Sequence, residues 1–189
     1  MNGLPNGWEL QPLSNIAKIY NGNSINKQIK QERYTGLSEG RNFIATKDVM
    51  IDGSVVYENG VKIPQTETTF KTAPAGSVFV CSEGGSAGRK TAYITQEVCF
   101  GNKLYAIVDE KNYFVGKYIY YFTRYNQFYE QFKELMNGII GGVSVKNFGT
   151  ITIPIPSISE QQRIVAKIEE LFSNLDASVA ELKTAKEKL

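Results

Sequence analysis

The 189-residue sequence contains no histidine and only two cysteines. Without histidine the chain has no His-activated nucleophile and no His metal ligand, so enzymes that depend on either are excluded. Cys81 and Cys99 have no partner at zinc-finger or Cys-x-x-Cys spacing, and the pattern predicts two reduced, buried thiols. We therefore expect no metal site in this chain.

Long apolar runs and a strong charge of one sign are also missing. No stretch has the length and hydrophobicity of a membrane span, and Met1–Gly7 has neither a basic nor an apolar region of the kind that begins a signal peptide. These absences predict a cytoplasmic chain without membrane contact. The net charge of +2 is too small to indicate a nucleic-acid partner by itself.

Catalytic motifs are absent as well. The Gly-rich segment from Ser82 to Thr91, SEGGSAGRKT, lacks the glycine–lysine spacing of a P-loop and the dinucleotide fingerprint. Two interpretations of the Gly-rich segment remain open: it is either a loop that contacts a phosphate or base, or a tight structural turn. Aspartate occurs at four positions, none of them paired as in a metal nuclease, and no methyl-transfer motif is present. We predict a non-catalytic protein.

The pattern predicts an α+β fold in which residues 1–158 form a mixed, β-rich domain. Short runs rich in β-branched and aromatic residues, separated by Gly and Asn turns, predict strands at Asn42–Thr46, Ser54–Tyr57, Ser77–Cys81, Thr91–Ile94, Lys103–Val108 and Thr150–Ile155. Between Lys117 and Met136 aromatic residues recur every three or four positions, which predicts one helix with a core face.

Residues 159–189 predict a second domain that consists of one long coiled-coil helix. Ser159 with Gln162 forms a capping-box signature, and Ser157 with Glu160 is an overlapping alternative. Apolar residues then follow a heptad spacing, and a helix of this length would extend about 45 Å at 1.5 Å per residue. We expect pairing with another helix through Ile164, Ile168, Leu171, Leu175, Leu182 and Leu189.

The junction from Ile153 to Val165, IPIPSISEQQRIV, resembles the specificity (S) subunits of type I restriction-modification systems. In that family an I-P-x-P-x-x-x-E-Q segment closes a target-recognition domain and begins a spacer helix. Weaker similarity lies at Gly7-Trp8, at Gly76–Val80 with the Gly-rich segment, at Gly101–Lys103 and at Gly142–Ser144. Family members often carry two such domains and two helices, so the single copy here suggests a half-length subunit that dimerises, or a fragment.

The resemblance implies a subunit that reads one half of a split double-stranded DNA target. Modification subunits would bind S-adenosylmethionine and methylate adenine, restriction subunits would cleave, and ATP and magnesium would belong to those partners. Cations and amide or hydroxyl groups are suited to phosphates and base edges. On residue type we expect DNA contacts from Lys27, Lys30, Arg33, Arg41, Lys47, Ser82, Ser86, Arg89, Lys90, Lys103, Ser144, Lys146 and Asn147, with Arg33, Arg41, Arg89 and Asn147 as base readers.

Two other functions fit the same residues. A protein-interaction adapter, with a β-rich domain, a coiled-coil tail and no DNA contact, agrees with the near-neutral charge, and solvated surface charge would explain the basic residues equally well. A small enzyme that binds a nucleotide at the Gly-rich segment is the other, and nucleotide-induced thermal stabilisation would reveal it.

Overall fold

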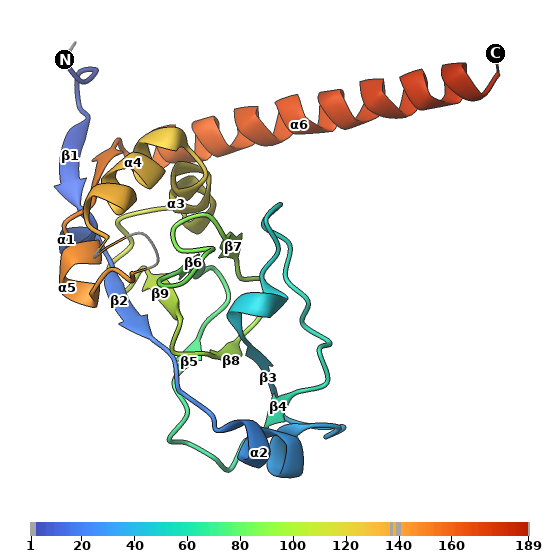
Figure 1. Ribbon diagram of the computed structural model, residues 1–189. Helices are drawn as coiled ribbons and strands as arrows, with labels where there is room; N and C mark the ends of the chain where they lie inside the picture. Colours follow the sequence, from blue (N-terminus) through green and yellow to red (C-terminus); the bar gives the residue numbers. More distant parts are fainter. Residues whose placement is uncertain (1–2, 137, 139–140, 189) are drawn as a thin grey trace.

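The computed structural model describes residues 3–136, 138 and 141–188 as a three-layered globular part from which one helix projects (Figure 1). A layer of short helices packs on a four-stranded sheet, and a second four-stranded sheet packs on the other face of the first. Strand β1 (Glu9–Pro12) pairs antiparallel with β10 (Thr152–Ile155), apart from both sheets. The α+β prediction is confirmed.

The central sheet is antiparallel throughout, in the order β2 (Lys18–Asn21), β9 (Leu104–Val108), β6 (Val78–Cys81) and β7 (Thr91–Tyr93). Both of its faces are covered. Val78 and Val80 contact the helical layer, whereas Phe79 and Cys81 pack against the second sheet. This division follows from the two-residue period of a strand, and it explains why β6 and β9 are continuous apolar runs.

The second sheet has the order β4 (Lys62–Ile63), β3 (Arg41–Ile44), β8 (Val98–Phe100) and β5 (Thr72–Ala73), with β3 and β8 parallel. A 3-10 turn, η2 (Thr46–Asp48), follows β3. Helix α2 (Lys27–Ile29) continues into the π-helical turn η1 (Lys30–Tyr34). Tyr34 from this turn joins a small outer core with Phe43, Ile63 and Cys99.

The helical layer consists of α1 (Leu13–Ile16), α3 (Gly116–Thr123), α4 (Asn126–Glu134) and α5 (Val145–Phe148). The prediction of one helix over residues 117–136 is wrong, because Tyr125 has an extended backbone (φ −84°, ψ 143°) that separates α3 from α4. The predicted core face is confirmed, since Phe122, Phe128 and Phe132 are buried. Tyr125 itself is 62% exposed.

Five of the six predicted strands are present, within one to two residues of their expected bounds. The segment Ser54–Tyr57 is not a strand, because its pairing is limited to a single bridge between Val55 and Val49. The sequence did not predict the strands β1, β2, β4, β5 and β8. Cys81 and Cys99 are free, buried thiols as predicted, and burial raises the pKa of Cys99 to about 11.

Helix α6 (Ile158–Glu187) has 30 residues and projects from the globular part beside α3 (Figure 1). Its N-cap is Ser157, whose Oγ accepts a hydrogen bond from the Glu160 backbone N–H at 3.3 Å. The overlapping alternative, Ser157, is therefore the N-cap, and a cap at Ser159 is wrong. None of the helices in the described part of the chain is long and apolar enough to span a membrane.

Candidate nucleic-acid interface

Three of the predicted DNA-contact lysines line one hollow of about 680 Å³ at the α2 end of the molecule. Lys27 and Lys30 come from α2 and η1, and Lys47 comes from η2. Asn26 caps α2, since its Oδ1 accepts a hydrogen bond from the Gln28 N–H at 2.8 Å. The hollow, called the lysine hollow below, is lined by Asn26, Lys27, Gln28, Lys30, Gln31, Glu32, Thr35, Lys47, Asn59 and Val61.

The lysine hollow carries a surplus of positive charge. No carboxylate of the described residues lies within 4 Å of the Lys27, Lys30 or Lys47 ammonium group. Glu32 is its one acidic lining residue, and the Gln28 amide donates to it at 2.8 Å. Unpaired ammonium groups beside amide side chains are suited to phosphate oxygens and to the edges of adenine.

The two predicted base readers of this region, Arg33 and Arg41, do not line the lysine hollow. Arg33 forms an ion pair with Glu67 at 3.0 Å, and 62% of its side chain is exposed. Arg41 donates to the backbone carbonyls of Pro64 and Glu67 at 3.2 and 2.8 Å. Arg41 thus fixes the loop after β4, while Arg33 stays accessible.

The Gly-rich segment folds as a tight turn. Its backbone bonds close on themselves, for example Gly88 N–H to the Cys81 carbonyl at 2.9 Å. Ser82 is buried, and both its N–H and its carbonyl hydrogen-bond to neighbouring backbone. The Lys90 ammonium donates to the Thr46 carbonyl at 3.1 Å, and Lys103 forms an ion pair with Glu83 at 2.9 Å.

Within this second set, Ser86 is half-buried, and Arg89 is exposed without a carboxylate partner among the described residues. The Arg89 guanidinium lies over the Tyr129 ring, 5.2 Å from its centroid, and its Nε donates to the Tyr129 hydroxyl at 3.0 Å. Arg124, Tyr125 and Asn126 share a hollow of about 300 Å³ with Arg89. Arg124 and Tyr125 were missed because the sequence placed them inside a core helix.

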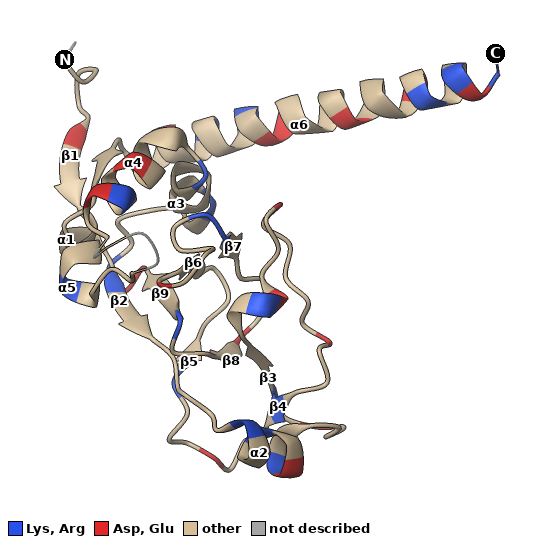
Figure 2. Ribbon diagram, viewed as in Figure 1, with Lys and Arg blue, Asp and Glu red and all other residues tan. Residues whose placement is uncertain are grey.

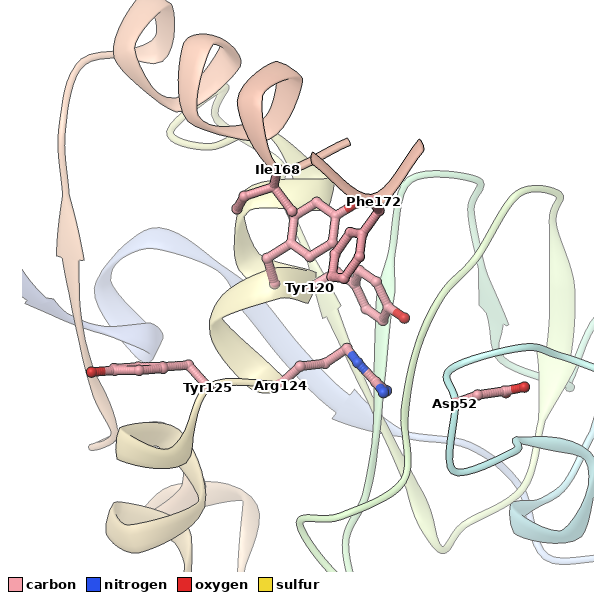
Figure 3. Close-up of a pocket in the computed structure, with 7 residues that line it drawn as sticks. Asp52, Tyr120, Arg124, Tyr125, Ile168 and Phe172 are labelled. Atoms are coloured by element: carbon pink, nitrogen blue, oxygen red, sulfur yellow. The ribbon is translucent and has the colours of Figure 1, made fainter. Parts of the chain in front are cut away.

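A further hollow of about 610 Å³ adjoins this one through Arg124 and Tyr125. Figure 3 shows Phe172 and Ile168 of α6 above Tyr120, with Arg124 extending toward the loop of Asp52. The hollow therefore lies between α3, the root of α6 and residues of the 50–53 loop.

The third predicted set lies on α5, which Figure 1 shows beside α1 and away from α2. Ser144 is the N-cap of α5 and accepts a hydrogen bond from the Asn147 N–H at 3.2 Å. Lys146 is exposed, and Asn147 is half-buried. The structure thus separates the three predicted sets rather than joining them in one surface. Figure 2 shows Lys and Arg segments at α2, at the turn after β3 and at α5 rather than gathered in one place.

The predicted pairing residues of α6 divide into two groups. Ile164 packs against the domain core and Ile168 lines the hollow below α6, so both contact the globular part. Leu171, Leu175 and Leu182 are 56%, 57% and 70% exposed. Leu189 lies outside the described residues. An apolar face that is open to a partner therefore begins at Leu171, and Val179 widens it. Phe172 is 55% exposed but also lines the hollow below α6, 6.3 Å from the Tyr121 ring.

Gln161 fixes the direction in which α6 leaves the domain. Its side chain is fully buried, and its Oε1 accepts a hydrogen bond from the Val115 N–H at 2.8 Å. Its Nε2 donates to the carbonyls of Tyr113 and Pro156 at 3.1 and 3.0 Å. One side chain thus joins the first turn of α6 to the segment before α3 and to the end of β10.

Comparison with known proteins identifies a matching family and relatives in sequence. Residues 5–187 match the family model of the type I restriction modification DNA specificity domain. The chain is 29% identical over 187 residues to the StySPI specificity subunit of Salmonella potsdam and 28% identical over 185 residues to the EcoKI specificity subunit of Escherichia coli. These alignments cover 95% and 94% of the chain but 39% of each relative.

Solved structures share the fold. The crystal structure of the HsdS subunit from Thermoanaerobacter tengcongensis matches 93% of the chain with a TM-score of 0.70 at 23% identity, over 40% of that subunit. The S subunit from M. genitalium matches 95% of the chain with a TM-score of 0.62, over 42% of its length. The chain therefore spans about two fifths of its relatives' length.

Both curated relatives are named specificity subunits, which agrees with the predicted resemblance to this family. The family match extends over nearly the whole chain, from the segment before β1 to the end of α6. This protein belongs to the family of type I restriction modification DNA specificity domains.

Proposed function

We propose that this chain recognises one half of a bipartite DNA target and positions the modification and restriction subunits of a type I complex. The observation that carries the proposal is the lysine hollow, which gathers three unpaired ammonium groups and several amide side chains in a member of a DNA specificity family. Residues 1–158 would read DNA and residues 159–189 would form the spacer helix. S-adenosylmethionine, ATP and magnesium would be bound by the partner subunits.

In this proposal Lys27, Lys30 and Lys47 contact backbone phosphates, because a compact ammonium group binds a phosphate as a point charge. Gln31 lines the same hollow and is exposed. It would bind a base edge, as glutamine does with adenine. Arg33 and Arg89 keep exposed guanidinium groups for guanine or phosphate. Peripheral backbone contacts would come from Ser86, Lys90, Lys103, Ser144, Lys146 and Asn147.

We also propose that two copies pair through the exposed face of α6 in an antiparallel arrangement. Net charge supports this direction, because residues 158–176 carry four acidic and two basic residues, whereas residues 177–188 carry three basic and two acidic ones. Antiparallel packing brings these opposite charges together. The 30-residue helix extends about 45 Å, more than one DNA turn of about 34 Å, which suits two half-sites separated by unread base pairs.

Fluorescence anisotropy with a labelled random-sequence duplex, titrated at several salt concentrations, tests DNA recognition. Lys27→Gln/Lys30→Gln/Lys47→Gln is expected to weaken binding at least about tenfold and to lower the log–log salt slope by about 2 to 3, since each phosphate contact contributes about 0.9. The matched control Lys111→Gln/Lys133→Gln/Lys167→Gln removes the same charge elsewhere and should bind like the wild type.

Absence of salt-dependent binding by the wild-type chain would contradict the proposal. It would favour the second candidate, a protein-interaction adapter, which the exposed leucine face of α6 would serve without any DNA.

A further inference from the structure

A second cationic hollow lies at the opposite end of the globular part from the lysine hollow, where α3 and α4 meet the Gly-rich turn (Figure 1). This hollow of about 300 Å³ is called the arginine hollow below. Two of its lining residues are arginines and none is acidic. The lining consists of Ile51, Gly88, Arg89, Thr123, Arg124, Tyr125, Asn126 and Tyr129.

The tight turn holds Arg89 at this hollow. Gly88 has φ +69°, and a Cβ there would lie 2.6 Å from the Phe132 ring, so glycine is what lets the turn pack against α4. Arg89 then lies over Tyr129 and uses its Nε in the hydrogen bond to the Tyr129 hydroxyl. Its two terminal nitrogens have no hydrogen-bond acceptor among the described residues.

Arg124 is held in a similar way on the other side. Its guanidinium lies over the Tyr120 ring, 5.7 Å from the centroid, and one Nη donates to the Ile51 carbonyl at 3.2 Å. No described carboxylate lies within 4 Å of Arg124 or Arg89. Asp52 lines the adjoining hollow, and its pKa is lowered by hydrogen bonds from Ser54 and, more weakly, by the charge of Arg124.

The backbone at the mouth of this hollow also favours an anion. Helix α4 begins there, its N-cap Tyr125 makes no side-chain capping bond, and no acidic residue lies in its first turn. The positive end of the helix dipole is therefore not offset locally. The side-chain amide of Asn126 is bound to Glu130 at 2.6 Å, so the two guanidinium groups supply the hydrogen-bond donors.

From this geometry we infer that the arginine hollow binds one backbone phosphate of the DNA, with Arg89 and Arg124 on the same phosphodiester. Planar guanidinium groups that aromatic rings hold in place bind phosphate with little loss of side-chain entropy. The inference rests on the proposed function and adds a second DNA contact to that of the lysine hollow. Because Arg124 and Tyr125 also line the hollow beside Ile168 and Phe172, the phosphate would fix the duplex relative to the root of α6.

The test compares Arg89→Gln/Arg124→Gln with Lys111→Gln/Lys133→Gln, a control with equal charge loss, in duplex binding by anisotropy. We expect the arginine variant to bind about tenfold more weakly, equally on all sequences, and to lower the salt slope by about 1, because both side chains neutralise one phosphate. Arg89→Lys/Arg124→Lys should keep the slope and lose affinity, since charge remains and the planar fork does not. Thermal unfolding checks that every variant is folded.

The outcomes separate the two proposals. If the wild type binds duplex, the lysine-hollow variant binds weakly and Arg89→Gln/Arg124→Gln binds like its control, the inference is overturned and the proposed function stands. If the wild type does not bind duplex, both are overturned. If millimolar pyrophosphate raises the melting temperature of the wild type but not of the arginine variant, while duplex affinity is unchanged, the hollow takes a free phosphate and not DNA.

Discussion

The two parts of α6 lie in opposite environments although they form one continuous helix. Its root, Ile158–Ile168, contains the buried Gln161 and Val165 and packs against α3. Its arm, from Leu171 to Glu187, exposes apolar side chains along one face and has no buried residue. The heptad pattern is the same in both parts. Periodicity alone therefore does not show which apolar residues of the helix contact their own domain and which are exposed.

The largest expected effect concerns the arm. Leu171→Glu/Leu175→Glu should prevent self-association, because a two-fold interface would bury four extra charges. The dissociation constant of the dimer should rise by roughly 1000-fold or more. The unfolding of the dilute monomer should change little, since both leucines are more than half exposed. Analytical ultracentrifugation over a concentration series measures the association.

The control for the arm is Ser173→Glu/Ala177→Glu, which places the same charges, also four residues apart, on the other side of the helix. A wild-type chain that stays monomeric at high concentration would contradict pairing. The arm would then not be the part of α6 that binds a second copy.

The next effect concerns the root. Gln161→Leu should lower the free energy of unfolding by about 3 kcal/mol or more, because the Val115 N–H and the carbonyls of Tyr113 and Pro156 lose their buried partner. Urea denaturation followed by circular dichroism measures the change. Gln162→Leu, at the exposed neighbouring position, should cost little. Equal costs at the two positions would show that the buried hydrogen bonds of Gln161 do not hold the root in place.

The smallest effect concerns Tyr118, whose hydroxyl donates to the Pro154 carbonyl at 2.6 Å and joins α3 to β10 beneath the root. Burial raises the pKa of Tyr118 to about 12, above the ordinary value of about 10. Its contribution to stability is therefore complete below pH ~10 and is lost as the pH rises through about 12.

Tyr118→Phe should cost about 1 kcal/mol at neutral pH and should make the alkaline loss of stability shallower than in the wild type. Urea denaturation at a series of pH values measures both. An unchanged alkaline slope would mean that Tyr118 ionises as easily in the folded chain as in the unfolded one.

Much of the fold could be predicted from local pattern, and the errors have physical causes. The spacing of Phe122 and Phe128 continues a helical period across the break at Tyr125, so periodicity did not reveal it. Strands of two or three residues, such as β4 and β8, are too short to show an alternation. The exposed arm of α6 was predictable because no globular part of this size could cover so long a helix.

The candidate site was less predictable, because it depends on which charges are already occupied. Lys27 and Lys47 are far apart in the sequence and share a hollow, whereas Arg41 is bound to two backbone carbonyls. Residue type could nominate all three equally. Nothing in the sequence indicated Arg124 as a site residue, since its surroundings are formed by the break between α3 and α4.

The pairing of β1 with β10 has one more consequence. Glu9 lies opposite Ile155, so the two ends of the segment 9–155 lie side by side, and Ile155 is three residues before the start of α6. A segment whose two ends lie side by side can be replaced by another of the same kind without displacing its neighbours. Replacement of residues 9–155 would therefore leave α6 and its first turn in place. Under the proposed function, such an exchange would change the DNA sequence that is recognised and leave the pairing face of α6 unchanged.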